Sequence, residues 1–162
     1  MGSAMTVELR KLSAADIESL VAMESANQAR PWTRGMFDDE LSGENRVYLG
    51  AFGGNSLLAF AGMLLNGEEA HVTNLLVAPD QRRRGLARRL LVGLIDEALS
   101  GGAKHLTLEV RSRNEAGISL YRRFGLAPVG VRKGYYGDDD ALVLWAYDID
   151  SPEYAKRLEG LR

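Results

Sequence analysis

A turn rich in glycine and arginine, between Val77 and Arg89, carries the residue types that bind phosphate. Gly85 and Ala87 are small, so backbone N–H groups at the start of a following helix can approach an anion closely. The arginines of this turn supply mobile positive charge, which suits a ligand with more than one phosphate; they are Arg82, Arg83, Arg84, Arg88 and Arg89. The alternative is a helix start whose arginines are merely solvated.

The same turn lacks the features of two common nucleotide-binding motifs. A P-loop has Gly-Lys-Ser/Thr at its end, and the dinucleotide fingerprint has three glycines at fixed spacing. Neither pattern occurs between residues 77 and 89. The sequence therefore disfavours kinases and Rossmann dehydrogenases.

Glu109 is the one acid in a segment of strand-like alternation, from His105 to Arg111. It alternates away from the apolar positions and can therefore face a cleft; those positions are Leu106, Leu108 and Val110. The chain has no cysteine and only two histidines, which excludes disulfides, cysteine-ligated zinc and a histidine-rich metal site. Base chemistry then falls to carboxylates or tyrosines. The alternative is that Glu109 pairs with Arg111 on the same face of the strand.

Composition is that of an ordinary globular protein. With 46% hydrophobic and 26% charged residues, 162 residues are enough for one core and one domain. Lys and Arg number 20 against 22 Asp and Glu, so the overall basic excess of a nucleic-acid-binding protein is missing. No apolar stretch approaches the roughly 18 residues that a membrane span needs. We therefore expect neither a nucleic-acid nor a membrane partner.

The start of the chain, residues 1–5, lacks the basic and apolar regions of a secretory signal. A second methionine after Gly-Ser-Ala suggests a cloning scar or a disordered start, and a cytoplasmic location is expected. We expect a single domain over residues 6–150. Ser151-Pro152-Glu153 is a good helix start, so residues 151–162 are expected to form a terminal helix or a frayed tail.

Periodicity predicts the elements that position these residues. Strands are expected at Val7–Lys11, Arg46–Phe52, Ser56–Leu65, Ala70–Val77, His105–Arg111, Pro128–Arg132 and Ala141–Asp148. Helices are expected from Ser13 to about Gln28, from Thr33 to near Gly43, from Leu86 to Gly101 and from Asn114 to Phe124. Three strands form an antiparallel meander, and one strand–helix–strand crossover follows it. The predicted fold class is α/β, with a mixed (α+β) and mostly antiparallel sheet.

The turn resembles a known cofactor-binding loop. Arg82-x-x-Gly85-x-Ala87 after a strand is similar to the Gln/Arg-x-x-Gly-x-Gly/Ala loop of the GNAT superfamily of N-acetyltransferases, which cradles the pyrophosphate of acetyl-CoA. The resemblance therefore implies the GNAT fold, acetyl-CoA as cosubstrate and no metal.

Further positions resemble the RimI-type ribosomal-protein N-alanine acetyltransferases within this superfamily. These are Leu108-Glu109-Val110-Arg111, Asn114, Leu120-Tyr121, the Arg132-to-Tyr136 segment and Pro31-Trp32-Thr33. Together they span about residues 31 to 148. The departures are Ala87 in place of the commoner second glycine, Gly117 in place of alanine, Gly125-Leu126 in place of Gly-Phe, and a short stretch from Tyr136 to Ala141. They leave the cofactor loop intact and bear on peptide specificity.

The resemblance assigns catalytic roles to two side chains. Glu109 is implied to be the general base that accepts a proton from the acceptor amine, through water. Tyr121 lies two helical turns beyond Asn114 and is implied to protonate the coenzyme A thiolate as general acid. The alternative for Tyr121 is packing in the core beside Leu120 and Phe124.

The resemblance also implies the cofactor contacts. The backbone of Leu75, Leu76 and Val77 is expected to pair with the pantetheine arm, and one of its N–H groups to polarise the thioester carbonyl. Phosphate contacts are expected from Arg82, Arg83, Arg84, Gly85, Leu86, Ala87 and Arg88. Asn114 is expected to contact the cofactor, and an ordinary helix cap is the alternative for it.

The acceptor side follows from the same resemblance. Trp32, Tyr135 and Tyr136 are expected to line a peptide groove, and the implied acceptor is the N-terminal alanine of ribosomal protein S18 or another protein N-terminus. The run Asp138-Asp139-Asp140 is either an attraction for a basic peptide or a solvated loop. A monomer or a weak dimer is expected.

Two other functions stay open from the sequence. The first is an acetyltransferase that acts on lysine side chains or a small-molecule amine, because fold and cofactor do not fix the acceptor. The second is a non-catalytic module that binds acetyl-CoA, against which the presence of both Glu109 and Tyr121 argues. An α-amine, with a pKa of about 8, is far more often neutral at pH 7 than lysine at about 10.4, which favours N-terminal acceptors.

Overall fold

The computed structural model describes residues 6–162, and the expectation of a cloning scar or disordered start lies outside these residues. Contacts between Cα atoms divide the chain into two compact units. The first holds the described residues up to Met63 together with Asn74–Leu94. The second holds Leu64–Thr73 and Ile95–Arg162. Each unit is described below by itself.

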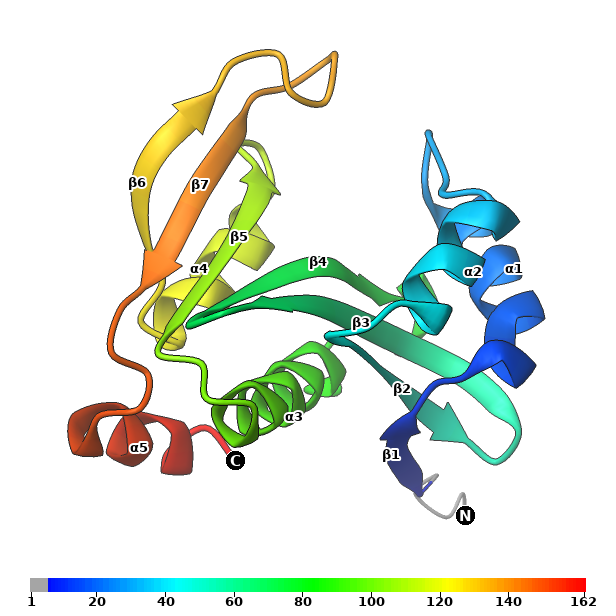
Figure 1. Cartoon of the computed structure of the whole chain (residues 1–162). Helices are drawn as coiled ribbons and strands as arrows, with labels where there is room; N and C mark the ends of the chain where they lie inside the picture. The colour runs from blue at the N-terminus through cyan, green and yellow to red at the C-terminus, as the bar shows by residue number, and fades with distance from the viewer. Residues whose placement is uncertain (1–5) are drawn as a thin grey trace. The chain divides into compact units, whose positions relative to one another are not determined.

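The described chain contains seven strands and five α-helices (Figure 1). The strands are β1 (Val7–Lys11), β2 (Arg46–Gly53), β3 (Ser56–Asn66), β4 (Glu69–Val77), β5 (His105–Arg111), β6 (Ala127–Arg132) and β7 (Ala141–Ala146). The helices are α1 (Ile17–Asn27), α2 (Arg34–Ser42), α3 (Leu86–Ser100), α4 (Glu115–Arg123) and α5 (Pro152–Glu159). Hydrogen bonds order the strands as β1-β2-β3-β4-β5-β7-β6.

The sheet is mixed, as the sequence predicts. β4 and β5 pair in parallel across the crossover formed by α3, while β5 with β7 and β6 with β7 pair antiparallel. Two boundaries differ from the prediction by more than one residue. The last strand ends at Ala146 rather than Asp148, because Asp148 takes a left-handed φ of 56° that an extended strand does not allow. The first helix begins with a short 3-10 turn, Ala14–Asp16, before α1.

The first unit packs α1 and α2 against an aromatic and aliphatic core. Its buried members are Leu12, Ile17, Leu20, Met23, Phe37, Tyr48, Phe52, Phe60 and Leu76. Thr33 starts α2 as the sequence predicts, because its hydroxyl accepts a hydrogen bond from the Met36 N–H at 3.2 Å. Gly62 lies under the Tyr48 ring so closely that a Cβ there would come within 2.4 Å of it. Only glycine therefore fits at this point of β3.

Glu24 is a buried carboxylate in the first unit, with 4% of its surface exposed. It lies on α1, and its Oε2 accepts a hydrogen bond from the Trp32 backbone N–H at 2.8 Å. Burial raises the pKa of Glu24, and this hydrogen bond lowers it in part. The contact fixes the loop that joins α1 to α2.

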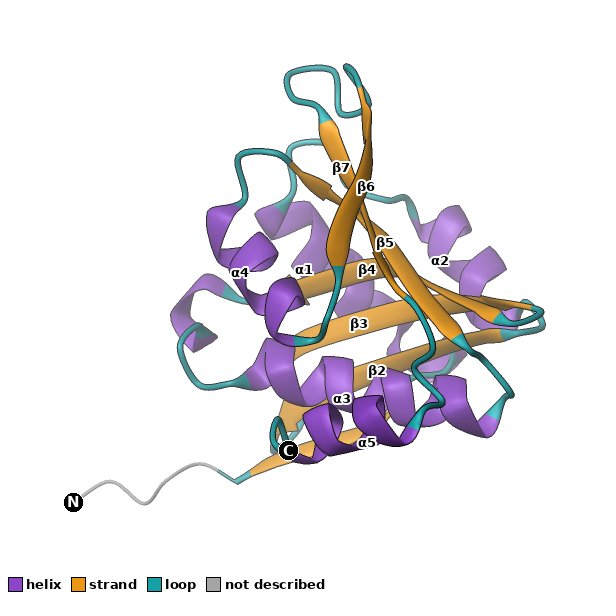
Figure 2. Cartoon of the chain, turned by 90° about the vertical axis from the view of Figure 1, so that its left-hand side faces the viewer, coloured by secondary structure: helices purple, strands orange, loops and turns teal. Residues whose placement is uncertain are grey.

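In the second unit, β5, β7 and β6 lie side by side, with α4 on one side of them (Figures 1 and 2). Leu106, Leu108 and Val110 are buried, at 0, 1 and 4% exposure, and form the apolar face of β5. The residues between them belong to the opposite face. β6 is an edge strand and is exposed along its whole length.

Two helix caps fix α4 and α5 in the second unit. Asn114 caps α4 by accepting from the Gly117 N–H at 2.9 Å, and Ser151 caps α5 by accepting from the Tyr154 N–H at 3.1 Å. The Tyr154 hydroxyl donates to the Phe124 carbonyl at 2.6 Å, which joins α5 to the end of α4. The last twelve residues thus include an ordered helix, one of the two forms considered from the sequence.

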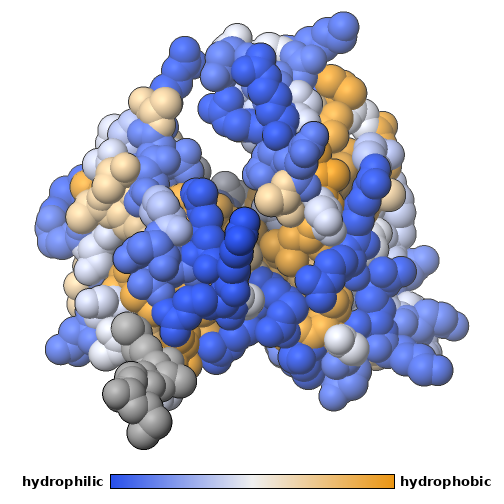
Figure 3. Space-filling model, turned by 180° about the vertical axis from the view of Figure 1, so that it is seen from behind, coloured by the Kyte–Doolittle hydropathy of each residue, from blue (hydrophilic) through white to orange (hydrophobic). Residues whose placement is uncertain are grey.

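The surface is mostly hydrophilic on the face shown in Figure 3, with smaller patches of hydrophobic residues. Among residues 6–162, no helix has both the length and the apolar character needed to cross a membrane.

The buried carboxylate of Glu24 makes a pH-dependent stability prediction. The pKa of Glu24 is raised in the folded protein above its ordinary value of 4.5, so the unfolded chain loses this proton first as the pH rises. Stability contributed by the protonated form is therefore complete below pH 4.5 and decreases as the pH rises through that value to the folded pKa. Glu24→Gln keeps an oxygen for the Trp32 N–H and removes this loss.

We expect the Tm of Glu24→Gln to exceed that of the parent at pH 7 to 8 and the difference to shrink toward pH 4. Thermal melts followed by circular dichroism across this range measure it. A Tm difference that does not change with pH would contradict the assignment of the raised pKa to Glu24.

Candidate active site

Glu109 lies in the middle of β5, on the face opposite the buried leucines, as the sequence predicts. Its side chain is 13% exposed. Oε2 lies 2.6 Å from Nε2 of His71 on β4, and Oε1 lies 3.6 Å from Nη2 of Arg132 at the end of β6. Three strands thus bring an acid, an imidazole and a guanidinium together in the second unit.

The alternative pairing of Glu109 with Arg111 is wrong. Arg111 instead forms an ion pair with Asp138 at 2.7 Å, and its guanidinium lies over the Tyr136 ring, 4.4 Å from the ring centre. Although Glu109 and Arg111 share a face of β5, the loop after β6 supplies a carboxylate and an aromatic ring that engage the arginine. The Glu109 carboxylate therefore interacts with side chains of other strands, His71 on β4 and Arg132 on β6.

Tyr135 and Tyr136 are adjacent residues whose rings meet edge to face, with centres 5.0 Å apart. Tyr135 is 53% exposed, and the Arg132 guanidinium lies 5.4 Å from its ring centre. Tyr136 is half-buried, and burial, followed by the proximity of Tyr135 and Glu109, raises its pKa. Tyr136 is therefore close enough to Glu109 for the two groups to interact electrostatically.

Tyr121 lies on α4 and is buried, at 7% exposure. Burial, with a smaller contribution from Tyr136, raises the pKa of Tyr121 to about 12. The phenol therefore keeps its proton throughout the physiological range and can donate it. Packing in the core and proton donation are compatible, because a buried tyrosine hydroxyl can still face a ligand.

Asn114 caps α4, which is the alternative role considered for it from the sequence. Its Oδ1 accepts from Gly117, and a Cβ on Gly117 would lie 2.6 Å from Nδ2 of Asn114. This contact explains why glycine replaces the alanine expected at position 117. Asn114 itself is exposed, so the cap leaves part of its amide accessible.

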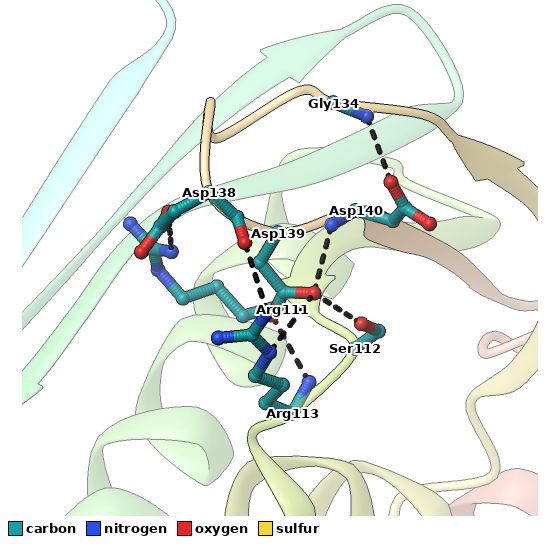
Figure 4. A network of polar contacts seen from close by, with 7 residues as sticks. All are labelled: Arg111, Ser112, Arg113, Gly134, Asp138, Asp139 and Asp140. Carbon is teal, nitrogen blue, oxygen red and sulfur yellow. Dashed lines mark hydrogen bonds and ion pairs between the residues drawn. The ribbon is translucent and has the colours of Figure 1, made fainter.

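The three aspartates between β6 and β7 hold their loop together rather than forming a free acidic patch (Figure 4). Asp139, with 9% exposure, accepts hydrogen bonds from the Ser112 hydroxyl, the Arg113 N–H at 3.1 Å and the Asp140 N–H at 2.8 Å. Asp140 accepts from the Gly134 N–H at 2.8 Å. The Ser112 hydrogen bond is the main cause that lowers the pKa of Asp139. Of the three, only Asp138 is strongly exposed, and it pairs with Arg111.

The glycine-and-arginine turn belongs to the first unit and precedes α3, as predicted. Gly85 has a left-handed φ of 73°, Arg83 one of 64°, and Leu86 is buried at the first position of the helix. The first N–H groups of a helix have no acceptor within it, so they can bind an anion. A Cβ on Gly85 would lie 3.1 Å from Nη2 of Arg88, so glycine keeps this corner open.

The charges around this turn also fit a polyphosphate. Arg82, Arg83 and Arg84 are exposed, while Ala87 is half-buried beside them. Left-handed backbone at an arginine is uncommon and is favoured where a turn must direct successive N–H groups to one side. Positive side chains and helix N–H groups together suit a ligand with several phosphates.

The remaining predicted residues also lie in the first unit. Leu76 is buried at the end of β4, with Leu75 and Val77 half-buried on either side of it, and the Ala78 N–H donates to the Leu58 carbonyl at 3.0 Å. Trp32 packs on Phe37 with ring centres 5.4 Å apart and is partly buried. Both segments are thus held by the core of their own unit.

Sequence reasoning missed the partners of Glu109. In the sequence, His71 is one of two histidines that are too few for a histidine-rich metal site, and Arg132 belongs to a segment of family resemblance; neither pattern indicates a contact with Glu109. The signal for His71 was its position as a polar residue between Ala70 and Val72, which are buried at 0 and 6% exposure. Within residues 6–162, no three His, Asp or Glu side chains cluster in a way that could hold a metal ion.

The chain matches a known protein family over most of its length. Residues 13–126 match the model of the acetyltransferase (GNAT) family. The chain is 36% identical over 137 residues to the [ribosomal protein bS18]-alanine N-acetyltransferase of Salmonella typhimurium, which covers 82% of this chain and 92% of that protein. It is 39% identical over 110 residues to the N-alpha-acetyltransferase RimI of Mycobacterium tuberculosis, covering 65% of this chain and 68% of that one.

A solved structure shows the same fold. The crystal structure of the ribosomal-protein-S18-alanine N-acetyltransferase from Escherichia coli superposes with a TM-score of 0.82 at 31% sequence identity. The match covers 88% of this chain and 94% of that one.

The aspartate network predicts unequal effects of neighbouring substitutions. Asp139→Ala leaves three donors without their acceptor, so we expect a lower Tm and a more mobile loop between residues 133 and 140. Asp138→Ala is the matched control: an exposed ion pair contributes little, and we expect a Tm close to that of the parent. Melting curves and amide hydrogen exchange of the loop measure both. Equal losses in the two variants would show that the buried carboxylate has no special part.

Proposed function

The chain belongs to the GNAT family of acetyltransferases and is an acetyl-CoA-dependent N-acetyltransferase, and on this premise we propose that it acetylates the N-terminal alanine of ribosomal protein bS18. The observation that supports this acceptor substrate is the 36% identity with the Salmonella typhimurium enzyme over 92% of its length. We assign the acetyltransferase domain to residues 6–150, because the family match takes in residues from both units.

Binding of acetyl-CoA falls to the turn and the strand end of the first unit. The phosphates are held by the arginines and N–H groups of the turn, at Arg82, Arg83, Arg84, Gly85, Leu86, Ala87 and Arg88. The pantetheine arm is held by the backbone of Leu75, Leu76 and Val77. When bound, acetyl-CoA supplies a thioester whose carbonyl carbon is open to attack by an amine. Asn114 adds a contact through the part of its amide that the helix cap leaves accessible.

Glu109 acts as the general base. The acceptor arrives as an ammonium, whose nitrogen has no free electron pair until a proton leaves. Glu109 takes this proton, directly or through one water, and is supported in this role by an orientation away from the apolar face and by a low exposure of 13%. An α-amine needs only a modest base, since about one in ten is already neutral at pH 7.

Tyr121 acts as the general acid. With a pKa of about 12 it stays protonated at neutral pH, so its hydroxyl has a proton to give when the thiolate of coenzyme A leaves. From ammonium to amide the nitrogen loses two protons: Glu109 takes the first, and the second leaves the nitrogen as the C–S bond breaks and replaces the proton that Tyr121 gives to the sulfur. The overall reaction therefore releases one proton, which Glu109 passes to water.

The acceptor peptide is bound by aromatic side chains. Trp32, Tyr135 and Tyr136 present ring surface that is at least partly exposed. Other protein N-termini offer the same α-amine chemistry. The activity is placed in the cytoplasm, where ribosomal proteins are made, and is assigned to a monomer or weak dimer.

An acetylation assay with defined acceptors tests the proposed substrate. We expect thiol release and a mass gain of one acetyl group at the α-amine of a peptide with the S18 N-terminus. The same peptide with a blocked α-amine and an internal lysine, or a simple polyamine, is expected to show neither.

Transfer only to lysine or polyamine would contradict the proposed acceptor, although the protein would still be an acetyltransferase. Tight binding of acetyl-CoA with no transfer to any amine would contradict catalysis itself and indicate a binding module.

Two substitutions test the catalytic roles. Because a positioned acid or base contributes roughly 10²- to 10⁴-fold, we expect Glu109→Gln and Tyr121→Phe each to lower kcat by at least about 100-fold. Both variants are expected to bind acetyl-CoA with the parent's Kd, measured by calorimetry. Full turnover by Glu109→Gln would remove it as the base, and full turnover by Tyr121→Phe would reduce Tyr121 to a packing residue.

A further inference from the structure

His71 contacts the proposed base and has no role in the mechanism described so far. Nε2 of His71 lies 2.6 Å from Oε2 of Glu109, a short distance for a nitrogen–oxygen hydrogen bond. The side chain of His71 is 36% exposed and that of Glu109 13% exposed. An ionised carboxylate only accepts hydrogen bonds, so Nε2 must carry the proton and donate it.

The pairing of the two backbone strands positions the side chains that make this contact. In the parallel pairing of β4 with β5, His71 lies opposite Thr107, two residues before Glu109. Ala70 and Val72, on either side of His71, are buried and hold it on the open face. Both side chains therefore start from paired strands, which position groups more firmly than loops do.

The two oxygens of the carboxylate have different surroundings. Oε2 is engaged by His71, while Oε1 has Arg132 at 3.6 Å, too far for a strong hydrogen bond but close enough for charge attraction. The Arg132 side chain is 57% exposed, and at 3.6 Å it does not engage Oε1 in a strong hydrogen bond. Oε1 is thus the oxygen whose lone pairs are open to an incoming proton.

We propose that His71 is a positioning residue for the general base: by donating from Nε2 to Oε2 it fixes the Glu109 carboxylate so that Oε1 faces the acceptor amine. In the proton-transfer step, the N–H bond of the ammonium breaks and an O–H bond forms on Oε1, and the electron pair stays on nitrogen. The inference rests on the proposed role of Glu109 as base. His71 touches neither reacting atom and acts only through the carboxylate.

Two substitutions at position 71 separate donation from packing. His71→Leu removes the donor, and His71→Gln keeps an N–H donor at a similar reach. We expect His71→Leu to lower kcat by roughly 10- to 100-fold, the cost of a misplaced catalytic group, with the KM for acetyl-CoA unchanged. His71→Gln is expected to recover kcat to within a few-fold of the parent. Glu69→Gln, two residues earlier on the same face of β4, is the matched control and should leave kcat unchanged.

Three kinetic outcomes would overturn the proposal. The first is a kcat of His71→Leu equal to that of the parent. The second is a kcat of His71→Gln as low as that of His71→Leu, which would show that the donor is irrelevant. The third is a rise in the KM for acetyl-CoA that accounts for the whole loss, which would move His71 to cofactor binding. The assay uses whichever amine the parent acetylates fastest, so an error in the proposed acceptor does not affect it.

Nitrogen NMR of the imidazole rings tests the contact without any turnover. The chain has two histidines, and His105 serves as an internal reference because its Nδ1 accepts from the Asp148 N–H at 3.2 Å, away from Glu109. We expect the His71 ring to carry its proton on Nε2 and its Nε2 signal to move in Glu109→Ala, while the His105 signals stay in place. An Nε2 without a proton, or a signal that does not move, would overturn the proposal even if the acceptor assignment holds.

Discussion

The register of β5 against its neighbours determines which side chains share a face with Glu109. β5 pairs with β4 on one side and β7 on the other, and β7 pairs with β6, so His71 and Arg132 reach the two oxygens of one carboxylate from distant parts of the sequence. Because side chains alternate along a strand, a slip by one residue would turn Glu109 into the apolar layer. The burial of Leu108 and Val110 prevents this slip and thereby holds the acid on the open face.

In the second unit, polar side chains near Glu109 pair with one another. The Glu109 carboxylate is therefore not taken up by Arg111 on its own strand. Arg111 would be its natural partner on the same strand, but Asp138 and the Tyr136 ring engage the guanidinium. Asp139 in turn ties the loop to Ser112 and Arg113, which keeps Asp138 and Tyr136 where they meet Arg111. In the first unit, the glycine-and-arginine turn exposes N–H groups and positive charge together. Left-handed backbone at Arg83 and Gly85 gives the turn this form.

The sequence predicted the elements well because their signals are local. The alternation in β5 and the Asn114 and Thr33 caps each depend on a few neighbouring residues. What it could not predict were contacts across strands. The pairing of His71 with Glu109 depends on the β4–β5 register, and the use of Asp139 inside its loop depends on how residues 112 and 113 approach it. Spacing along the chain gives neither distance. Gly117, a departure from the family's alanine, lies against the amide of Asn114, which a Cβ at position 117 would approach to 2.6 Å.

The central claim is that Glu109 accepts a proton from an N-terminal amine while Tyr121 donates a proton to the sulfur of coenzyme A. The most direct measurement is a crystal structure of the protein with a bisubstrate analogue, in which an acetyl linker joins the sulfur of coenzyme A to the α-nitrogen of an alanine-initiated peptide. The account predicts Oε1 of Glu109 within one water of that nitrogen and the Tyr121 hydroxyl within hydrogen-bond distance of the sulfur. An α-nitrogen that contacts neither Glu109 nor a water bound to it, with another carboxylate or imidazole in its place, would contradict the account.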